Sequence, residues 1–161
     1  MKLKVPYHRQ RTDFTCGPAS AKMLLGYWGQ RVSERRLRAI FNTQPRSGTR
    51  RVRLARGLRR FGLRVLTACD ASLADLRCAL SLGLPPIINY REPESDISHF
   101  AVVIGLEGGK LILNDPDLGP GYRITVSDFV GRWYGMHRGK NARWLLIAAG
   151  PGSDFPPRCR R

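Results

Sequence analysis

The sequence lacks long hydrophobic runs, paired metal-ligand spacings and a phosphate-binding loop. No stretch approaches the ~18 apolar residues of a membrane-spanning helix, and the N-terminus lacks the apolar run of a signal peptide. Residues 135–141 resemble a phosphate-binding loop but are one residue short between the glycines and have no Ser or Thr after Lys140. Cysteines occur only at positions 16, 69, 78 and 159, without metal-ligand spacing. We therefore expect a cytoplasmic protein with reduced thiols and no cofactor or metal.

Acidic residues are also scarce, at 12 against 28 Lys and Arg, and the formal net charge is +16. Arginine runs at 35–36, 50–53 and 59–60 could neutralise phosphates, so an Arg-rich nucleic-acid-binding protein is one alternative. These arginines fall on the polar faces of amphipathic helices, without interleaved aromatic residues for base stacking. We therefore do not expect nucleic acid to be the main partner. The arginines form either a solvated face or a face that attracts acidic substrates.

Cys16 lies at the predicted start of a helix, which is a favourable position for a nucleophilic thiol. Pro18 fits the first turn of a helix, apolar residues follow at helical spacing, and Gly26 and Gly29 mark its end. The positive end of the helix dipole and unpaired backbone N–H groups favour a thiolate there. Gln10, six positions earlier, and the Cys16 N–H could both donate to an oxyanion. The alternative is a small core cysteine without chemistry.

A cysteine nucleophile needs a base, and the candidates are His8, His99 and His137. His99 opens a β-branched and apolar run over 98–106, which predicts a central strand that would hold the imidazole rigidly. His8 lies in the N-terminal segment and His137 in a glycine-flanked loop. The sequence therefore favours His99, and the alternative is an ordinary strand-edge histidine.

An acid that orients the imidazole must lie on the same face of the sheet as His99. After the His99 strand the chain turns and returns as a second strand that leads to Asp115, which predicts a β-hairpin. A two-residue turn would pair Val102 with Asp115 and point the carboxylate away from His99. A three-residue loop would instead pair Ala101 with Asp115, so we predict an odd-length loop or a bulge here. Asn114 and Asp117 are the reserve candidates, and Asp115 itself could be only a turn former.

Length and composition indicate one domain, since 161 residues with 42% hydrophobic content bury one core but hardly two. Further helices are predicted over 51–61, 72–83 and 127–133, and strands over 63–68, 86–90, 98–106, 111–114, 122–126 and 144–149. This order predicts an α+β domain over 1–150, in which a helical N-terminal lobe packs against an antiparallel β-sheet C-terminal lobe. A cleft between the lobes would bring Cys16 to His99 and Asp115. Residues 151–161, rich in Pro and Arg, have no packing pattern and predict a flexible tail.

Several short motifs follow one another in an order that is typical of one peptidase family. They are Val5-Pro6-Tyr7 before Gln10, Cys16-Gly17-Pro18-Ala19, Gly48-Thr49, Phe61-Gly62-Leu63, His99-Phe100, and Asp115-Pro116 with Gly119. In these motifs, over nearly its whole length, the chain resembles the papain-like bacteriocin-processing, or double-glycine leader, cysteine peptidases and their stand-alone relatives. It departs from them at Thr15, where members that cut leader peptides often have an acidic residue; here the nearest acid is Asp13.

The resemblance implies a papain-like fold and a catalytic set of Cys16, His99 and Asp115, with Gln10 in the oxyanion hole. It also implies hydrolysis of peptides through a thioester, with cleavage after Gly-Gly in a leader peptide, and it requires no cofactor. The implied partners are a peptide or protein substrate and a membrane transporter that exports it. Two alternatives stay open: a papain-like module that binds a peptide without turnover, and transfer of the acyl group to an acceptor other than water.

Overall fold

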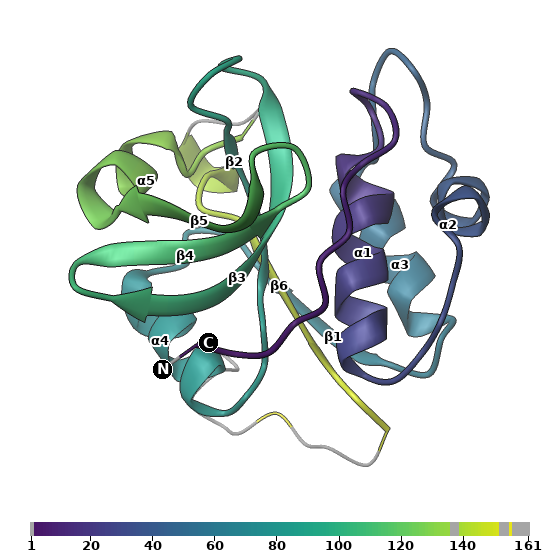
Figure 1. Ribbon diagram of the computed structural model, residues 1–161, viewed down its shortest axis with the longest axis horizontal. Helices are drawn as coiled ribbons and strands as arrows, with labels where there is room; N and C mark the ends of the chain where they lie inside the picture. The colour runs from purple at the N-terminus through teal and green to yellow at the C-terminus, as the bar shows by residue number, and fades with distance from the viewer. Residues whose placement is uncertain (1, 136–138, 152–154, 156–161) are drawn as a thin grey trace.

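The computed structural model describes residues 2–135, 139–151 and 155 (Figure 1). The helices are α1 (Cys16–Tyr27), α2 (Glu34–Phe41), α3 (Arg51–Arg59), α4 (Leu73–Ser81) and α5 (Val126–Arg132), with a 3-10 turn η1 (Gly139–Asn141). The strands are β1 (Arg64–Ala68), β2 (Ile87–Arg91), β3 (Ser98–Glu107), β4 (Lys110–Asp115), β5 (Gly119–Thr125) and β6 (Leu145–Ala149). All strand pairs are antiparallel, in the order β1-β6-β2-β3-β4-β5.

Helices cover both faces of the sheet (Figure 1). On one face α1, α2 and α3 form a lobe whose core includes Phe100, Val102 and Ile104 of β3. On the other face α4 and α5 pack against the alternate residues Ala101 and Val103. The predicted α+β fold with a helical N-terminal lobe is therefore confirmed, and the sheet lobe carries two helices of its own. Strand β3 is buried on both faces, which explains its continuous apolar run.

Helix α1 begins at Cys16, with Pro18 in its first turn, as predicted. Gly17 is required here, because a Cβ at this position would lie 2.6 Å from Oγ1 of Thr49. Gly29, with a φ of 76°, turns the chain after the helix. The start of α1 is therefore held close to the loop before α3, and this packing positions Cys16.

Two features differ from the sequence predictions. Helix α2, which had not been assigned, is a strongly amphipathic helix that Ser33 caps by accepting from the N–H of Arg36. Within the predicted tail 151–161, Phe155 is buried beside the sheet, with the guanidinium of Arg64 over its ring. The prediction of a segment without packing is wrong at this residue; residues 152–154 and 156–161 lie outside the described part of the chain.

Candidate active site

The β3–β4 hairpin contains the predicted bulge, and the bulge places Asp115 beside His99. The turn is the two-residue Gly108–Gly109 type, with Glu107 paired to Lys110, but the register shifts by one residue at Ile104. Val102 consequently pairs with Asn114. The next position of β4 thus falls on the face of the sheet that carries His99. Nε2 of His99 lies 2.9 Å from Oδ1 of Asp115, and both side chains are buried.

Asp115 is the most highly bonded carboxylate of the site. Oδ1 also accepts the backbone N–H groups of Asp117 and Leu118, at 2.9 and 3.0 Å, and Oδ2 accepts the hydroxyl of Tyr90 at 2.7 Å. Burial alone would raise the pKa of Asp115, but the bonds from His99, Leu118 and Tyr90 outweigh it and lower the pKa. Asp115 is therefore held as an anion in a fixed orientation.

The side chain of Cys16 is close enough to His99 to raise the pKa of the imidazole, so the ring has the thiol and the carboxylate as neighbours. Burial alone would lower the pKa of His99, but Cys16 and Asp115 outweigh it and raise the pKa to about 10. The arrangement favours an imidazolium ring at neutral pH. One turn into α1, the hydroxyl of Ser20 donates to the carbonyl of Phe100 at 3.2 Å, and this buried bond ties the helix that begins at Cys16 to the strand that contains His99.

The first turn of α1 has no side-chain cap. Thr15 precedes Cys16 but makes no side-chain cap, because its hydroxyl donates to the Thr12 carbonyl instead. The first N–H groups of a helix have no partner within the helix. Gln10 is held near the hairpin by a 2.9 Å bond from its backbone N–H to the carbonyl of Pro116. Cys16, His99, Asp115 and the Gln10 segment therefore converge at one end of the sheet.

The other candidates have different surroundings. Nε2 of His8 lies 2.6 Å from Oε2 of Glu34, whereas His137 lies outside the described residues. Asn114 donates to the carbonyl of Val5 and accepts from the N–H of Gly121, so it anchors the N-terminal segment. Asp117 contributes its backbone N–H to Asp115. None of these contacts places His8 beside the thiol, or the side chain of Asn114 or Asp117 against the imidazole.

Three residues of the site had not been predicted: Ser20, Asn89 and Tyr90. Asn89 donates from Nδ2 to the carbonyl of His99 at 3.1 Å and accepts two bonds from the guanidinium of Arg51. Tyr90 is directly opposite His99 in the β2–β3 ladder. Each lies in an apolar strand or helix, where the local pattern indicates core packing only. A signal was available for Asn89 alone, because an amide in a continuous apolar strand needs hydrogen-bond partners.

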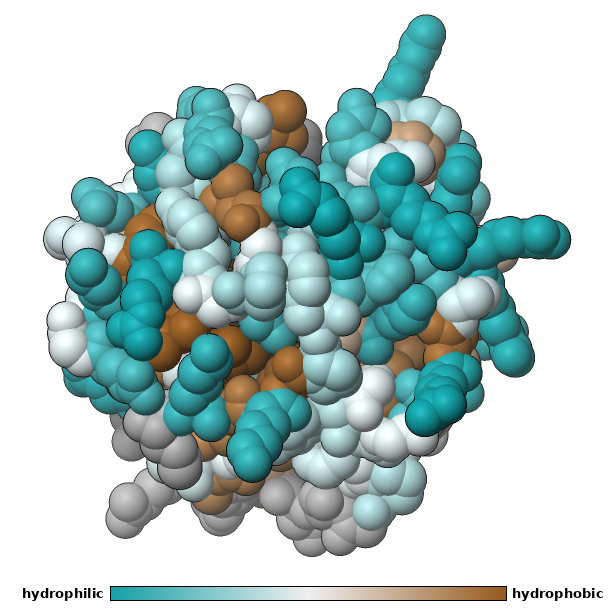
Figure 2. Space-filling model, viewed as in Figure 1, coloured by the Kyte–Doolittle hydropathy of each residue, from teal (hydrophilic) through white to brown (hydrophobic). Residues whose placement is uncertain are grey.

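A cleft of about 740 Å³ opens beside Cys16, between α3 and the sheet. The wall of the cleft includes Arg51 and Arg59 of α3 and Arg50, which directly precedes that helix. Cys69 and Trp144 also line the cleft. Arg51 is not a freely solvated charge, since it bonds Asn89 and packs over the Trp144 ring, and burial lowers its pKa. Figure 2 shows hydrophilic side chains covering the part of the molecule where α2 and α3 lie. The Cys16 cleft thus adjoins the arginine-rich face.

Within residues 2–135, 139–151 and 155, no group of three or more His, Cys, Asp or Glu side chains is arranged to hold a metal. The helices of this part of the chain are all too short or too polar to cross a bilayer.

Comparison with known proteins identifies one family. A model of the peptidase C39 family matches residues 4–137. The transport/processing ATP-binding protein MesD for mesentericin Y105, from Leuconostoc mesenteroides, is 29% identical over 139 residues, which are 83% of this chain. The same region is 18% of MesD, so this chain spans under a fifth of the length of that relative.

Solved structures share the fold. The peptidase domain of Streptococcus ComA, a bifunctional ABC transporter, superposes with a TM-score of 0.73 at 21% identity, over 92% of this chain and 98% of that domain. A double-glycine-motif protease from an AMS/PCAT transporter, in complex with the leader peptide, gives 0.71 at 23% identity, over 91% and 92%. A C39-like peptidase from Bacillus anthracis gives 0.68 at 14%, over 95% and 100%.

Proposed function

Because this chain belongs to the peptidase C39 family, we propose that it is an active cysteine peptidase. The single observation that carries the proposal is the buried group Cys16, His99 and Asp115, in which the imidazole bonds the carboxylate at 2.9 Å and has the thiol as a neighbour. A module that only binds peptides has no need of a buried, fully bonded carboxylate behind a histidine. This group is the arrangement that acyl transfer through a thioester requires.

In the proposed mechanism Cys16 attacks the scissile carbonyl as a thiolate, and His99 begins as its imidazolium partner. The C–S bond forms, the C–N bond breaks, and His99 gives its proton to the leaving amine. Water then attacks the thioester while His99 takes up its proton, the C–S bond breaks, and Cys16 leaves as the thiolate, which restores the starting ion pair. The Cys16 N–H and the Gln10 amide would hold the oxyanion, each donor worth on the order of 3 kcal/mol of barrier. Asp115 orients His99 throughout.

The substrate that we propose is a leader peptide that ends in two glycines. Two similarities support this substrate: MesD combines transport with processing, and the AMS/PCAT protease is a double-glycine-motif protease seen with its leader peptide. A transporter of such a peptide is the partner that we propose for this chain.

We expect wild-type protein to cleave a peptide after Gly-Gly and to leave its Ala-Ala analogue uncut. If the site admits only glycine on this side of the scissile bond, as the proposed substrate requires, methyl groups at both positions would displace the scissile carbonyl from Cys16. Cleavage sites in a peptide library, read by mass spectrometry, provide the measurement. Cys16-dependent cleavage at other sites would support the peptidase assignment and reject the preference for Gly-Gly.

The arginine-rich wall of the cleft supports a preference for acidic peptides. Arg50 and Arg59 are exposed and line the cleft that contains Cys16. A cationic wall beside the reacting thiol raises the local concentration of anionic substrate and does not alter the chemical step. The charge of this face therefore acts on KM.

We expect the double variant Arg50→Gln and Arg59→Gln to raise KM for a Glu-bearing peptide about threefold to tenfold at low salt, with kcat unchanged. Its KM should also depend less on salt than that of the wild type. The matched control is Arg35→Gln with Arg36→Gln, which removes the same charge from exposed positions of α2 that do not line the cleft. Equal effects of the two double variants would reject a specific role for the cleft wall. If RNA binds to this wall and the acidic peptide does not compete with it, a nucleic-acid partner would be favoured instead.

A further inference from the structure

Glu34 is the single acidic residue in a stretch that carries twelve arginines. Ten of these arginines, all within residues 31–64, are exposed and two are half-buried. Glu34 is only 5% exposed and is the first residue of α2. A buried carboxylate is costly unless hydrogen bonds and nearby positive charge stabilise it, and a helix N-terminus offers part of that stabilisation. The remaining partners of Glu34 come from the N-terminal segment.

The Glu34 carboxylate binds the N-terminal segment on either side of Gln10. Oε2 lies 2.6 Å from Nε2 of His8, and Oε1 accepts the backbone N–H of Arg11 at 3.3 Å. Gln10 lies between these two points, and its own backbone N–H donates to the Pro116 carbonyl, one residue after Asp115. The segment is therefore tied to α2 by Glu34 and to the β4–β5 connection by Gln10.

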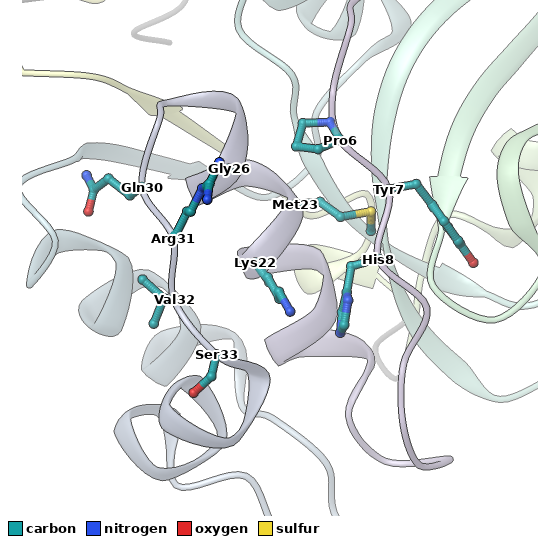
Figure 3. A pocket seen from close by; sticks show the side chains of 10 residues that line it. All are labelled: Pro6, Tyr7, His8, Lys22, Met23, Gly26, Gln30, Arg31, Val32 and Ser33. Carbon is teal, nitrogen blue, oxygen red and sulfur yellow. The ribbon is translucent and has the colours of Figure 1, made fainter.

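These hydrogen bonds matter because a pocket lies along one side of the N-terminal segment, so packing does not hold the segment there. Figure 3 shows Pro6, Tyr7 and His8 along a pocket of about 490 Å³, which α1 and the connection to α2 close on its other sides. Oε1 of Gln10 is buried and has no hydrogen-bond partner within the described part of the chain. The position of the Gln10 side chain therefore depends on how its backbone is held.

We propose that Glu34 is a positioning residue that holds Gln10 where its amide meets the oxyanion. This inference rests on the proposed function, since it gives Gln10 a role in the reaction. An oxyanion donor acts only when it is pre-oriented, and a displacement of about 1 Å can cost on the order of 10²-fold in rate. Glu34, from α2, holds the His8 side chain on one side of that donor and the Arg11 backbone on the other.

A double-mutant cycle tests the proposal. We expect Glu34→Ala to lower kcat about tenfold, with KM nearly unchanged, because the donor is displaced only at the transition state. In the Gln10→Ala background the same substitution should lower kcat by less than about twofold, because no donor is left to misplace. The melting temperature should fall by a similar amount in both backgrounds. An equal loss of kcat in both backgrounds would overturn the proposal.

The matched control is Asp75→Ala, which removes another first-turn acid, from the capping box of α4. It should lower the melting temperature without changing kcat. Glu34→Gln retains an acceptor for the Arg11 N–H and should recover most of kcat. If Glu34→Ala does not fold, Glu34→Leu, which fills similar space and has no acceptor, takes its place in the cycle.

A readout without turnover separates this proposal from the proposed function. Hydrogen exchange of the peptide over residues 8–12 should accelerate in Glu34→Ala and stay unchanged in Asp75→Ala. If the wild type shows no Cys16-dependent cleavage, the proposed function fails, and the exchange experiment still decides whether Glu34 holds the segment. Unchanged exchange over residues 8–12 in Glu34→Ala would overturn the positioning role.

Discussion

Replacing Cys16 by alanine is expected to reduce kcat/KM for a cleaved peptide on the order of 10⁶-fold, to the level of the oxyanion site and binding alone. The sulfur is the protein atom that bonds the substrate covalently in the proposed mechanism, so no neighbouring side chain can replace it. The substitution should leave the fold intact, because Cys16 is small, 7% exposed and packed in the core at the start of α1. Cleavage of a labelled peptide and the melting temperature are the measurements.

The matched control is Cys78→Ala, a half-buried cysteine on α4, which should retain full turnover. Binding of the same peptide should survive in Cys16→Ala, because the cleft is unchanged. Equal cleavage by wild type and Cys16→Ala would contradict the enzyme assignment. Binding without cleavage by the wild type would instead support a peptide-binding module.

The parts of this site that local rules govern could be predicted from the sequence. Pro18 at the third position of a helix marks where α1 begins, and that start determines which backbone N–H groups near Cys16 have no partner. The register of the β3–β4 hairpin could also be predicted. The period-2 alternation of side chains, together with the need for His99 and Asp115 on one face, requires one extra residue in the ladder, and the bulge at Ile104 supplies it.

The parts that depend on contacts between distant segments could not be predicted. Tyr90 looks like any buried strand residue, and its bond to Asp115 exists only because β2 and β4 both flank β3. Ser20 likewise resembles a helix residue until α1 packs on β3. Glu34 would be assigned to a solvated face from its arginine neighbours, whereas it is buried by a segment more than twenty residues earlier. Tertiary packing overrides local composition in each case.

Replacing Asp115 should have the second largest effect, and its size should depend on the replacement. Asp115→Ala is expected to lower kcat/KM about 10⁴-fold, because His99 loses the partner that orients it. Asp115→Asn should lose only about 10- to 100-fold. An amide oxygen in place of Oδ1 still accepts the N–H groups of His99, Asp117 and Leu118, which fixes the orientation of the amide. The NH₂ group then faces Tyr90, whose hydroxyl rotates to accept.

The Asn variant keeps the orientation of His99 and removes the charge, so its effect should appear in the pH dependence. In the wild type the pKa of His99 is raised to about 10 from its ordinary 6.5, in part by Asp115. The resulting stabilisation is complete below pH 6.5 and is lost as the pH rises toward about 10. Without the carboxylate the pKa of His99 should fall, so this loss and the alkaline limb of kcat/KM should both move to lower pH.

NMR titration of the His99 ring, unfolding free energies between pH 6 and 10, and pH profiles of kcat/KM together measure the shift. The matched control is Asp117→Asn, which removes an exposed carboxylate two positions away and leaves its backbone N–H to bond Asp115. An alkaline limb unmoved in Asp115→Asn would mean that Asp115 acts on His99 by orientation alone. Equal activity of the Asp115→Asn and Asp115→Ala variants would instead mean that the charge of Asp115 dominates, because loss of that charge is the one change that both variants share.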